Sequence, residues 1–138
     1  MTYGTPETPT SFSIHAKQNA NKFEPGSKSM VEIIAMSETL KLFSAVGMET
    51  IGAEARRLAG LLRDGLRNDG MSIFNPQEGA IINFSAGTME KNLKISSALK
   101  KAKISYALRG PGIRLSVHAF NLDFEINAAL NVINGATK

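Results

Sequence analysis

The segment 113–118, Ile-Arg-Leu-Ser-Val-His, alternates apolar and polar residues, and its polar members are the chain's best candidates for chemistry. Because successive side chains of a strand point to opposite faces, the apolar residues are expected against helices and the polar residues on the other face. The polar set is Arg114, Ser116 and His118. A guanidinium holds a carboxylate through two parallel hydrogen bonds, so Arg114 could bind an anion, with Ser116 and His118 beside it. A solvated sheet face gives the same pattern, and the pattern alone favours that simpler interpretation.

A second candidate anion site is the pair Gly26-Ser27, which lies just before a predicted helix start. Free amides at a helix N-terminus, together with a hydroxyl and the neighbouring Lys28, attract phosphate. Ordinary capping of the helix explains the same residues more simply. No glycine-rich phosphate loop of recognised spacing is present.

Several other kinds of site are excluded or disfavoured by composition. The chain has no cysteine, and its two histidines do not form a metal-binding spacing. A G-x-S-x-G motif is also missing, so a serine nucleophile of that type is not expected. The sequence therefore predicts no metal site and no disulfide.

Length and charge are those of one soluble globular domain. A chain of 138 residues with 43% hydrophobic and 20% charged residues can bury a core without disulfides. The net charge of +4 permits nucleic-acid binding, but the basic residues are scattered and no aromatic residues interleave them. No apolar run has the length of a membrane span, and the N-terminus does not resemble a signal peptide. We therefore expect a cytoplasmic protein that binds neither nucleic acid nor membrane.

The elements that must position these residues follow from periodicity and turn signals. Apolar residues recur at helical spacing in two long segments, and again after Thr88 and after Asn121, each of which is a good N-cap residue. Predicted helices are 29–46, 49–67, one beginning after Thr88 and one beginning after Asn121. Predicted strands are 71–74, 80–85, 104–108 and 113–117. This order predicts an α+β fold: a mostly antiparallel sheet of about four strands with helices packed on one face.

The N-terminal residues 1–22 are rich in Thr, Pro, Gly and Ser, which predicts an extended lead-in segment rather than a helix. The domain itself is expected to span 23–138.

Two stretches resemble the class V aminotransferases. Phe23-Glu24-Pro25-Gly26-Ser27, followed by a long helix, resembles their F-E-x-G-T-P stretch. The segment 112–121, G-I-R-L-S-V-H-A-F-N, resembles their closing I-R-x-S-x-H-x-Y-N-T strand and helix cap. Isopenicillin N epimerase and the selenocysteine-lyase type of cysteine desulfurase share this pattern. The resemblance covers roughly residues 22–134 and implies the C-terminal small domain of such an enzyme.

The resemblance implies a role for three residues. Arg114 matches the arginine that grips the α-carboxylate of an amino-acid substrate. Ser27 matches the threonine that reaches the phosphate of pyridoxal phosphate in the partner subunit of a homodimer, and Gly26 matches the glycine that permits this approach. The departures from the pattern are Ser27 in place of Thr, Lys28 in place of Pro and Leu122 in place of Thr.

The lysine that holds the cofactor in this family belongs to a large domain, well before the F-E-x-G stretch. Only 22 residues precede Phe23 here. The segment 13–17, Ser-Ile-His-Ala-Lys, loosely resembles the family's lysine motif, but its lysine is misplaced, and we interpret Lys17 as an exposed loop residue. The chain is therefore expected to hold no catalytic residue, to bind no pyridoxal phosphate covalently and to be inactive alone, as a fragment or truncated product of a longer enzyme.

A second hypothesis belongs to another class of protein. A stand-alone α+β module without catalytic activity, which associates with itself or with a partner, would have the same composition and the same elements. Self-association is expected, because a small domain without its large domain leaves apolar surface uncovered. A nucleic-acid binder is the least favoured alternative, since it rests on charge alone.

Overall fold

The structure of the chain is a computed structural model that describes residues 18–23, 26–75 and 79–137. The chain divides into two units, one ending at Leu42 and the other beginning at Phe43. Lys17, most of the predicted lead-in segment and two residues of the predicted turn, 24 and 25, lie outside the described residues. The predicted domain boundary at residue 22 stays a prediction.

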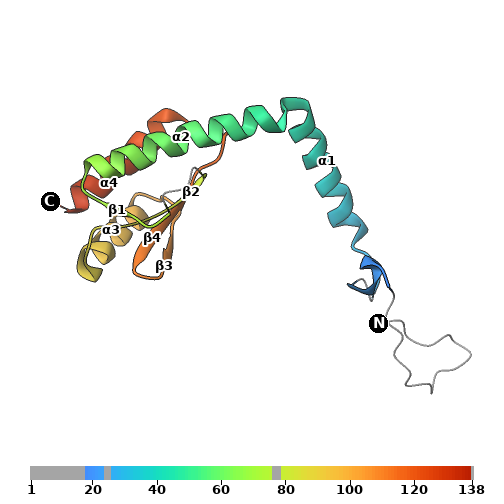
Figure 1. Ribbon diagram of the computed structural model, residues 1–138, viewed down its shortest axis with the longest axis horizontal. Coiled ribbons are helices and arrows are strands. Elements are labelled where there is room, and N and C mark those ends of the chain that lie inside the picture. Colours follow the sequence, from blue (N-terminus) through green and yellow to red (C-terminus); the bar gives the residue numbers. More distant parts are fainter. Residues whose placement is uncertain (1–17, 24–25, 76–78, 138) are drawn as a thin grey trace, which may run out of the picture. The chain divides into compact units, whose positions relative to one another are not determined.

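The first unit contains the 3-10 helix η1 (Ala20–Phe23) and most of helix α1 (Met30–Val46) (Figure 1). The sequence predicted α1 to within one residue. None of its residues is buried. Apolar side chains that are at least half exposed are Met30, Val31, Ile34, Met36, Leu40, Leu42 and Val46. A helix that is apolar over most of its surface is normally covered by other protein, so the exposed apolar side chains of α1 form a candidate contact surface.

Gly47 separates α1 from helix α2 (Met48–Asn68), with a backbone φ of 91° that falls in the left-handed region favoured by glycine. The predicted end of the first helix at residue 46 is therefore confirmed. The predicted apolar stripe of α2 is confirmed in its second half, where Leu58, Leu62 and Leu66 are almost completely buried. In its first half Ile51 is only partly buried.

The second unit contains a four-stranded antiparallel sheet in the order β1-β2-β4-β3. Its strands are β1 (Ser72–Ile73), β2 (Ile81–Ser85), β3 (Ala107–Arg109) and β4 (Gly112–Ser116). The two short strands β1 and β3 form the edges, and β2 and β4 pair in the middle. The predicted α+β class and antiparallel sheet are confirmed.

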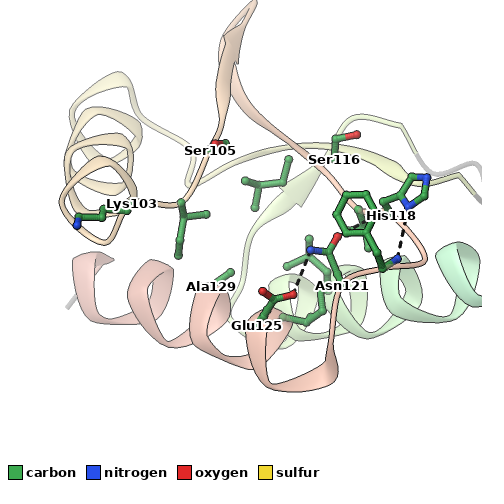
Figure 2. Close-up of a pocket in the computed structure, with 13 residues that line it drawn as sticks. Lys103, Ser105, Ser116, His118, Asn121, Glu125 and Ala129 are labelled. Carbon is green, nitrogen blue, oxygen red and sulfur yellow. Dashed lines mark hydrogen bonds between the residues drawn. The ribbon is translucent and has the colours of Figure 1, made fainter. Parts of the chain in front are cut away.

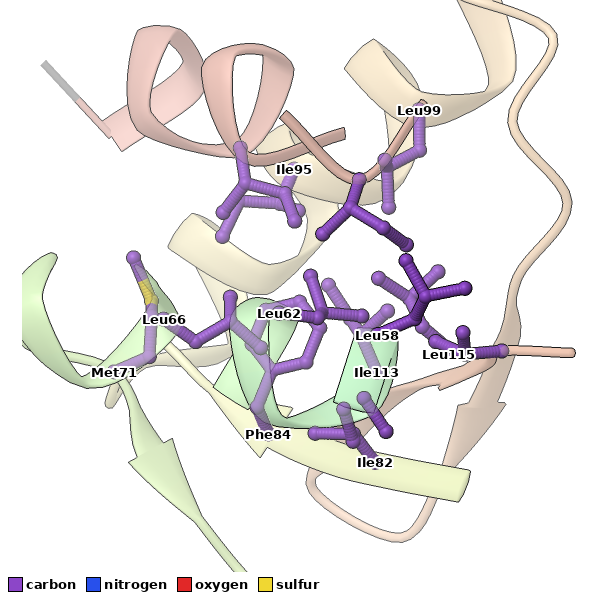
Figure 3. Close-up of a cluster of buried hydrophobic side chains, with 14 residues drawn as sticks. Leu58, Leu62, Leu66, Met71, Ile82, Phe84, Ile95, Leu99, Ile113 and Leu115 are labelled. Atoms are coloured by element: carbon purple, nitrogen blue, oxygen red, sulfur yellow. The ribbon is translucent and has the colours of Figure 1, made fainter. Parts of the chain in front are cut away.

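Helices α2, α3 (Met89–Lys101) and α4 (Asp123–Thr137) bury one face of the sheet, here called the inner face (Figure 3). The sheet contributes Ile82, Phe84, Ile113 and Leu115 to the core, and Ile95 and Leu99 of α3 pack on them. Each such side chain stabilises the fold by roughly 1.5–3 kcal/mol relative to exposure. The core thus fixes the register of β2 and β4, and with it the residues on the opposite, outer face.

Capping explains two helix ends. The Thr88 hydroxyl accepts a hydrogen bond from the Lys91 amide at 3.3 Å, so the predicted cap of α3 is confirmed. At the other end, the Lys103 amide donates to the Lys100 carbonyl and the Ile104 amide donates to the Leu99 carbonyl. This pair of bonds, with Lys103 at a φ of 59°, forms a Schellman motif.

That motif corrects the third predicted strand. We expected a strand at 104–108, but Ile104 still satisfies a helix carbonyl and β3 begins only at Ala107. The last predicted cap is also wrong. The side-chain oxygen of Asn121 accepts from the His118 amide at 2.9 Å, and the Glu125 carboxylate accepts from the Leu122 amide at the start of α4. Leu122, the first apolar residue after Asn121, is 55% exposed and does not join the core.

Candidate functional site

Arg114 lies in the middle of β4, on the outer face of the sheet. Ile113, Leu115 and Val117 are at most 5% exposed, whereas Arg114 is partly buried and Ser116 is exposed. The predicted alternation is therefore confirmed, because the apolar residues of this strand face the helices. Val117 extends the pairing beyond β4 by donating its amide hydrogen to the Ala80 carbonyl at 2.8 Å.

The Arg114 guanidinium forms no hydrogen bond or ion pair with any residue in the described part of the chain. None of the four strands contains an aspartate or glutamate. Register places Asn83 of β2 and Ala107 of β3 directly opposite Arg114. A structural ion pair therefore does not explain this arginine, and its five N–H donors are available to an anion.

Asn83, which the sequence did not single out, adds an unusual feature next to Arg114. Its side-chain oxygen is buried and has no hydrogen-bond partner among the described residues. Its backbone amide donates to the side-chain oxygen of Asn75 at 2.7 Å, so the strand position itself is well held. A buried acceptor without a donor costs roughly 1–3 kcal/mol, and directly opposite residues are close enough for a guanidinium to supply one.

Gly112 leaves room for two neighbouring side chains on the outer face beside Arg114. A Cβ atom at this position would lie 2.6 Å from the Phe84 carbonyl oxygen, 2.7 Å from the Phe74 ring and 2.9 Å from the Asn83 side-chain oxygen. Phe74 and Asn83 therefore rest directly over this glycine. The absence of a side chain at Gly112 is required by its neighbours rather than by backbone conformation.

Ser116 and His118 line a different hollow, a pocket of about 560 Å³ between the end of β4, the start of α4 and the loop after α3 (Figure 2). Lys103, Asn121 and Glu125 also line it, but Arg114 does not. The three polar residues of the 113–118 segment are thus close in the chain but do not line one pocket. Ser116 and His118 as neighbours of a bound anion stay a prediction.

His118 is held by the turn that leads into α4. Its ring stacks on Phe120 with centroids 4.3 Å apart, and its Nδ1 accepts from the Phe120 amide at 3.4 Å. Hydrogen bonds from the Leu122 amide, and secondarily from Asn121, lower the pKa of Glu125. These interactions form a capping network around His118. The described residues contain no cluster of three metal-ligating side chains.

Gly26 and Ser27 belong to the other unit and line a separate hollow of about 490 Å³ at the start of α1. Ser27 and Ser29 offer hydroxyl donors there, and Lys28 and Glu32 line the same hollow. No atom lies within 4 Å of a Cβ built on Gly26, so the backbone is open to approach at this point. This donor set fits one edge of a phosphate group.

No helix in the described ranges is long and apolar enough to cross a membrane.

Solved structures confirm the fold. The chain is similar to 8-amino-7-oxononanoate synthase from Francisella tularensis, with a TM-score of 0.66 and 18% sequence identity. The match covers 83% of this chain but only 35% of that one, so the likeness concerns about a third of the larger protein. Among curated proteins none matches this sequence. The family model of class V aminotransferases matches residues 2–119, and the chain therefore belongs to the class V aminotransferase family.

Proposed function

We propose that this chain is the C-terminal small domain of a pyridoxal-phosphate-dependent enzyme that acts on an amino acid, with Arg114 binding the substrate α-carboxylate. The observation that carries the proposal is the partly buried Arg114 guanidinium, which has no partner among the described residues and lies on a sheet face without acidic residues. A cation in that setting is stabilised by an anion from outside the chain.

Each residue has a defined task in this proposal. Arg114 binds the carboxylate through two parallel hydrogen bonds and thereby fixes the orientation of the α-carbon. Pyridoxal phosphate, when bound, supplies an electron-withdrawing ring that weakens the bonds to that carbon. Ser27 donates its hydroxyl to the cofactor phosphate of a partner subunit, and Gly26 leaves room for it. In this proposal a lysine of a large domain carries the cofactor, and the chain alone should show no turnover when pyridoxal phosphate is added.

The apolar surface of α1 supports a homodimer, in which α1 is covered by protein from outside its own unit. The same surface also fits a module that only associates and has no catalytic task. Arg114 favours the enzyme domain, because an association module has no need of an unpaired guanidinium on a sheet face. We place the enzyme in the cytoplasm because the chain has no cysteine and needs no disulfide.

The test is direct binding of a monocarboxylate to the chain. Arginine side chains labelled with ¹⁵N allow the Arg114 Nε–H resonance to be followed during a titration with butyrate at constant ionic strength. We expect saturable shifts of Arg114 that disappear in Arg114→Gln and weaken in Arg114→Lys, since lysine cannot form the bidentate contact.

Arg67→Gln is the matched control, because it removes the same charge from an exposed site on α2 that is paired with Asp64. The proposal is wrong if butyrate leaves the Arg114 resonance unchanged. It is equally wrong if Arg67→Gln weakens binding as much as Arg114→Gln, because net charge would then explain the effect.

A further inference from the structure

A second arginine, Arg109, shares the outer face with Arg114. The register of β3 and β4 pairs Arg109 with Gly112 and Ala107 with Arg114. Residues two apart on a strand lie on the same face, so Arg109, Ala107, Gly112 and Arg114 form one square on the outer face. Arg109 and Arg114 occupy one diagonal of it, and diagonal neighbours are roughly 7–8 Å apart, within reach of long side chains.

The other diagonal of the square is formed by the two residue types with the smallest side groups. Ala107 has a single methyl group and Gly112 has no side chain. Gly112 cannot be larger, because the Phe74 ring and the Asn83 side-chain oxygen rest over it. The short Ala107 side chain therefore leaves space between the two guanidiniums, and the half-exposed Phe74 ring borders that space over Gly112.

The two positive charges of this square have no acidic partner within the described part of the chain. Arg109, like Arg114, forms no hydrogen bond or ion pair with any described residue. Two neighbouring cations on a face without acids repel each other, and the repulsion is relieved when anions bind between them. One carboxylate would neutralise only one of the two guanidiniums.

We infer that the substrate of this site carries a second carboxylate, held by Arg109 while Arg114 holds the α-carboxylate. The substrate class is an acidic amino acid or the corresponding dicarboxylic keto acid. The carbon atoms between the two carboxylates lie over Ala107, against the edge of the Phe74 ring that covers Gly112. The inference rests on the proposed role of Arg114 and assigns Arg109 as the residue that determines specificity.

The experiment compares two four-carbon acids that differ by one carboxylate. Succinate and butyrate are titrated into the full 138-residue chain at equal ionic strength, and the Nε–H resonances of both arginines are followed. We expect succinate to bind at least about tenfold more tightly than butyrate, with both arginines shifting together. Butyrate should shift Arg114 alone.

Three variants separate the possible causes. Arg109→Gln should bring succinate to within about twofold of butyrate, because it should lower the affinity for succinate far more than the affinity for butyrate. Arg109→Lys should retain only part of the preference, because the ammonium lacks the planar fork. Arg67→Gln removes the same charge from α2 and should leave the preference intact.

The outcomes distinguish this inference from the proposed function. If butyrate binds at Arg114 but succinate binds no more tightly, or if Arg109→Gln leaves the succinate preference in place, the second carboxylate site is refuted and the role of Arg114 stands. If neither acid shifts Arg114, both proposals fall together. An equal loss of preference in Arg109→Gln and Arg67→Gln would attribute it to net charge and would also refute the site.

Discussion

The two faces of the central sheet differ in whether their side chains are covered by the rest of the chain. On the inner face, Ile82, Ile113 and Leu115 are buried under three helices. On the outer face of the same strands, Arg109 and Arg114 have no partner among the described residues, and the Asn83 side-chain oxygen lacks a donor. The inner face is closed by apolar packing, while the outer face leaves two positive charges without an acidic partner among the described residues. This contrast identifies the outer face as the place to look for a ligand.

The largest effect is expected on the inner face. Ile113→Ala removes a side chain that is 0% exposed and should destabilise the second unit by about 2–5 kcal/mol, because it loses burial and leaves a cavity. Urea unfolding followed by circular dichroism measures the change. Carboxylate binding by the fraction that remains folded should be unaltered. A change in butyrate affinity would contradict the prediction that the inner face takes no part in binding.

Gly112→Ala should lower the stability of the fold although Gly112 lies on the outer face, because this residue is crowded by backbone. The new Cβ would lie 2.6 Å from the Phe84 carbonyl oxygen, so strands must shift, at a cost of about 1–3 kcal/mol. Gly60→Ala on α2 is the matched control, since nothing lies within 4 Å of its added Cβ. The control should raise the free energy of unfolding by about 0.5–1 kcal/mol, as alanine is the better helix former. A tolerated Gly112→Ala would mean that Phe74 and Asn83 do not rest on this glycine.

Helix α1 is a second region whose side chains are exposed, and these side chains are apolar. The double variant Met36→Glu, Leu40→Glu places charges among exposed apolar residues of α1 and should weaken self-association by about tenfold or more. Light scattering across a concentration series measures the effect. Phe124→Glu, at an exposed apolar position of α4, serves as the control and should leave association unchanged. A chain that is already a monomer at high concentration would contradict the role given to α1.

The smallest effect on stability is expected at Arg114. Arg114→Ala should change the free energy of unfolding by no more than about 0.5 kcal/mol, because no described partner is abandoned. In a longer enzyme the same change should lower kcat/KM on the order of a hundredfold, through loss of a charge-assisted contact. A steep loss of stability would reveal a structural role, and unimpaired kinetics would remove Arg114 from the site.

The fold class and the orientation of Arg114 could be predicted from the sequence because both depend on local periodicity. The alternation over 113–117 and the leucine stripe of α2 are visible in the printed residues. The positions of β3 and of the cap on α4 could not be predicted in the same way. Lys103 adopts a helix-ending conformation that is more common for glycine. At α4, the Glu125 carboxylate accepts from the amide of Leu122, the residue just before the helix.

Arg109 and Asn83 escaped prediction for a different reason. Their importance comes from facing Gly112 and Arg114 across strand pairs, and register is a property of two strands rather than of one. A tight turn at Gly110-Pro111 sets the β3–β4 register, and the pairing of β2 with β4 joins segments far apart in the chain. A signal was nevertheless present, since Asn83 interrupts an otherwise apolar run in β2.

The two edge strands bear on how this chain can aggregate. β1 has two residues and β3 has three, and β3 ends in a charged arginine. Such short edges offer few unpaired backbone groups to a strand from another molecule, and a charge at the edge opposes stacking further. Growth into fibrils by strand addition is therefore disfavoured. The predicted self-association therefore depends on side chains such as those of α1 and not on the edges of the sheet.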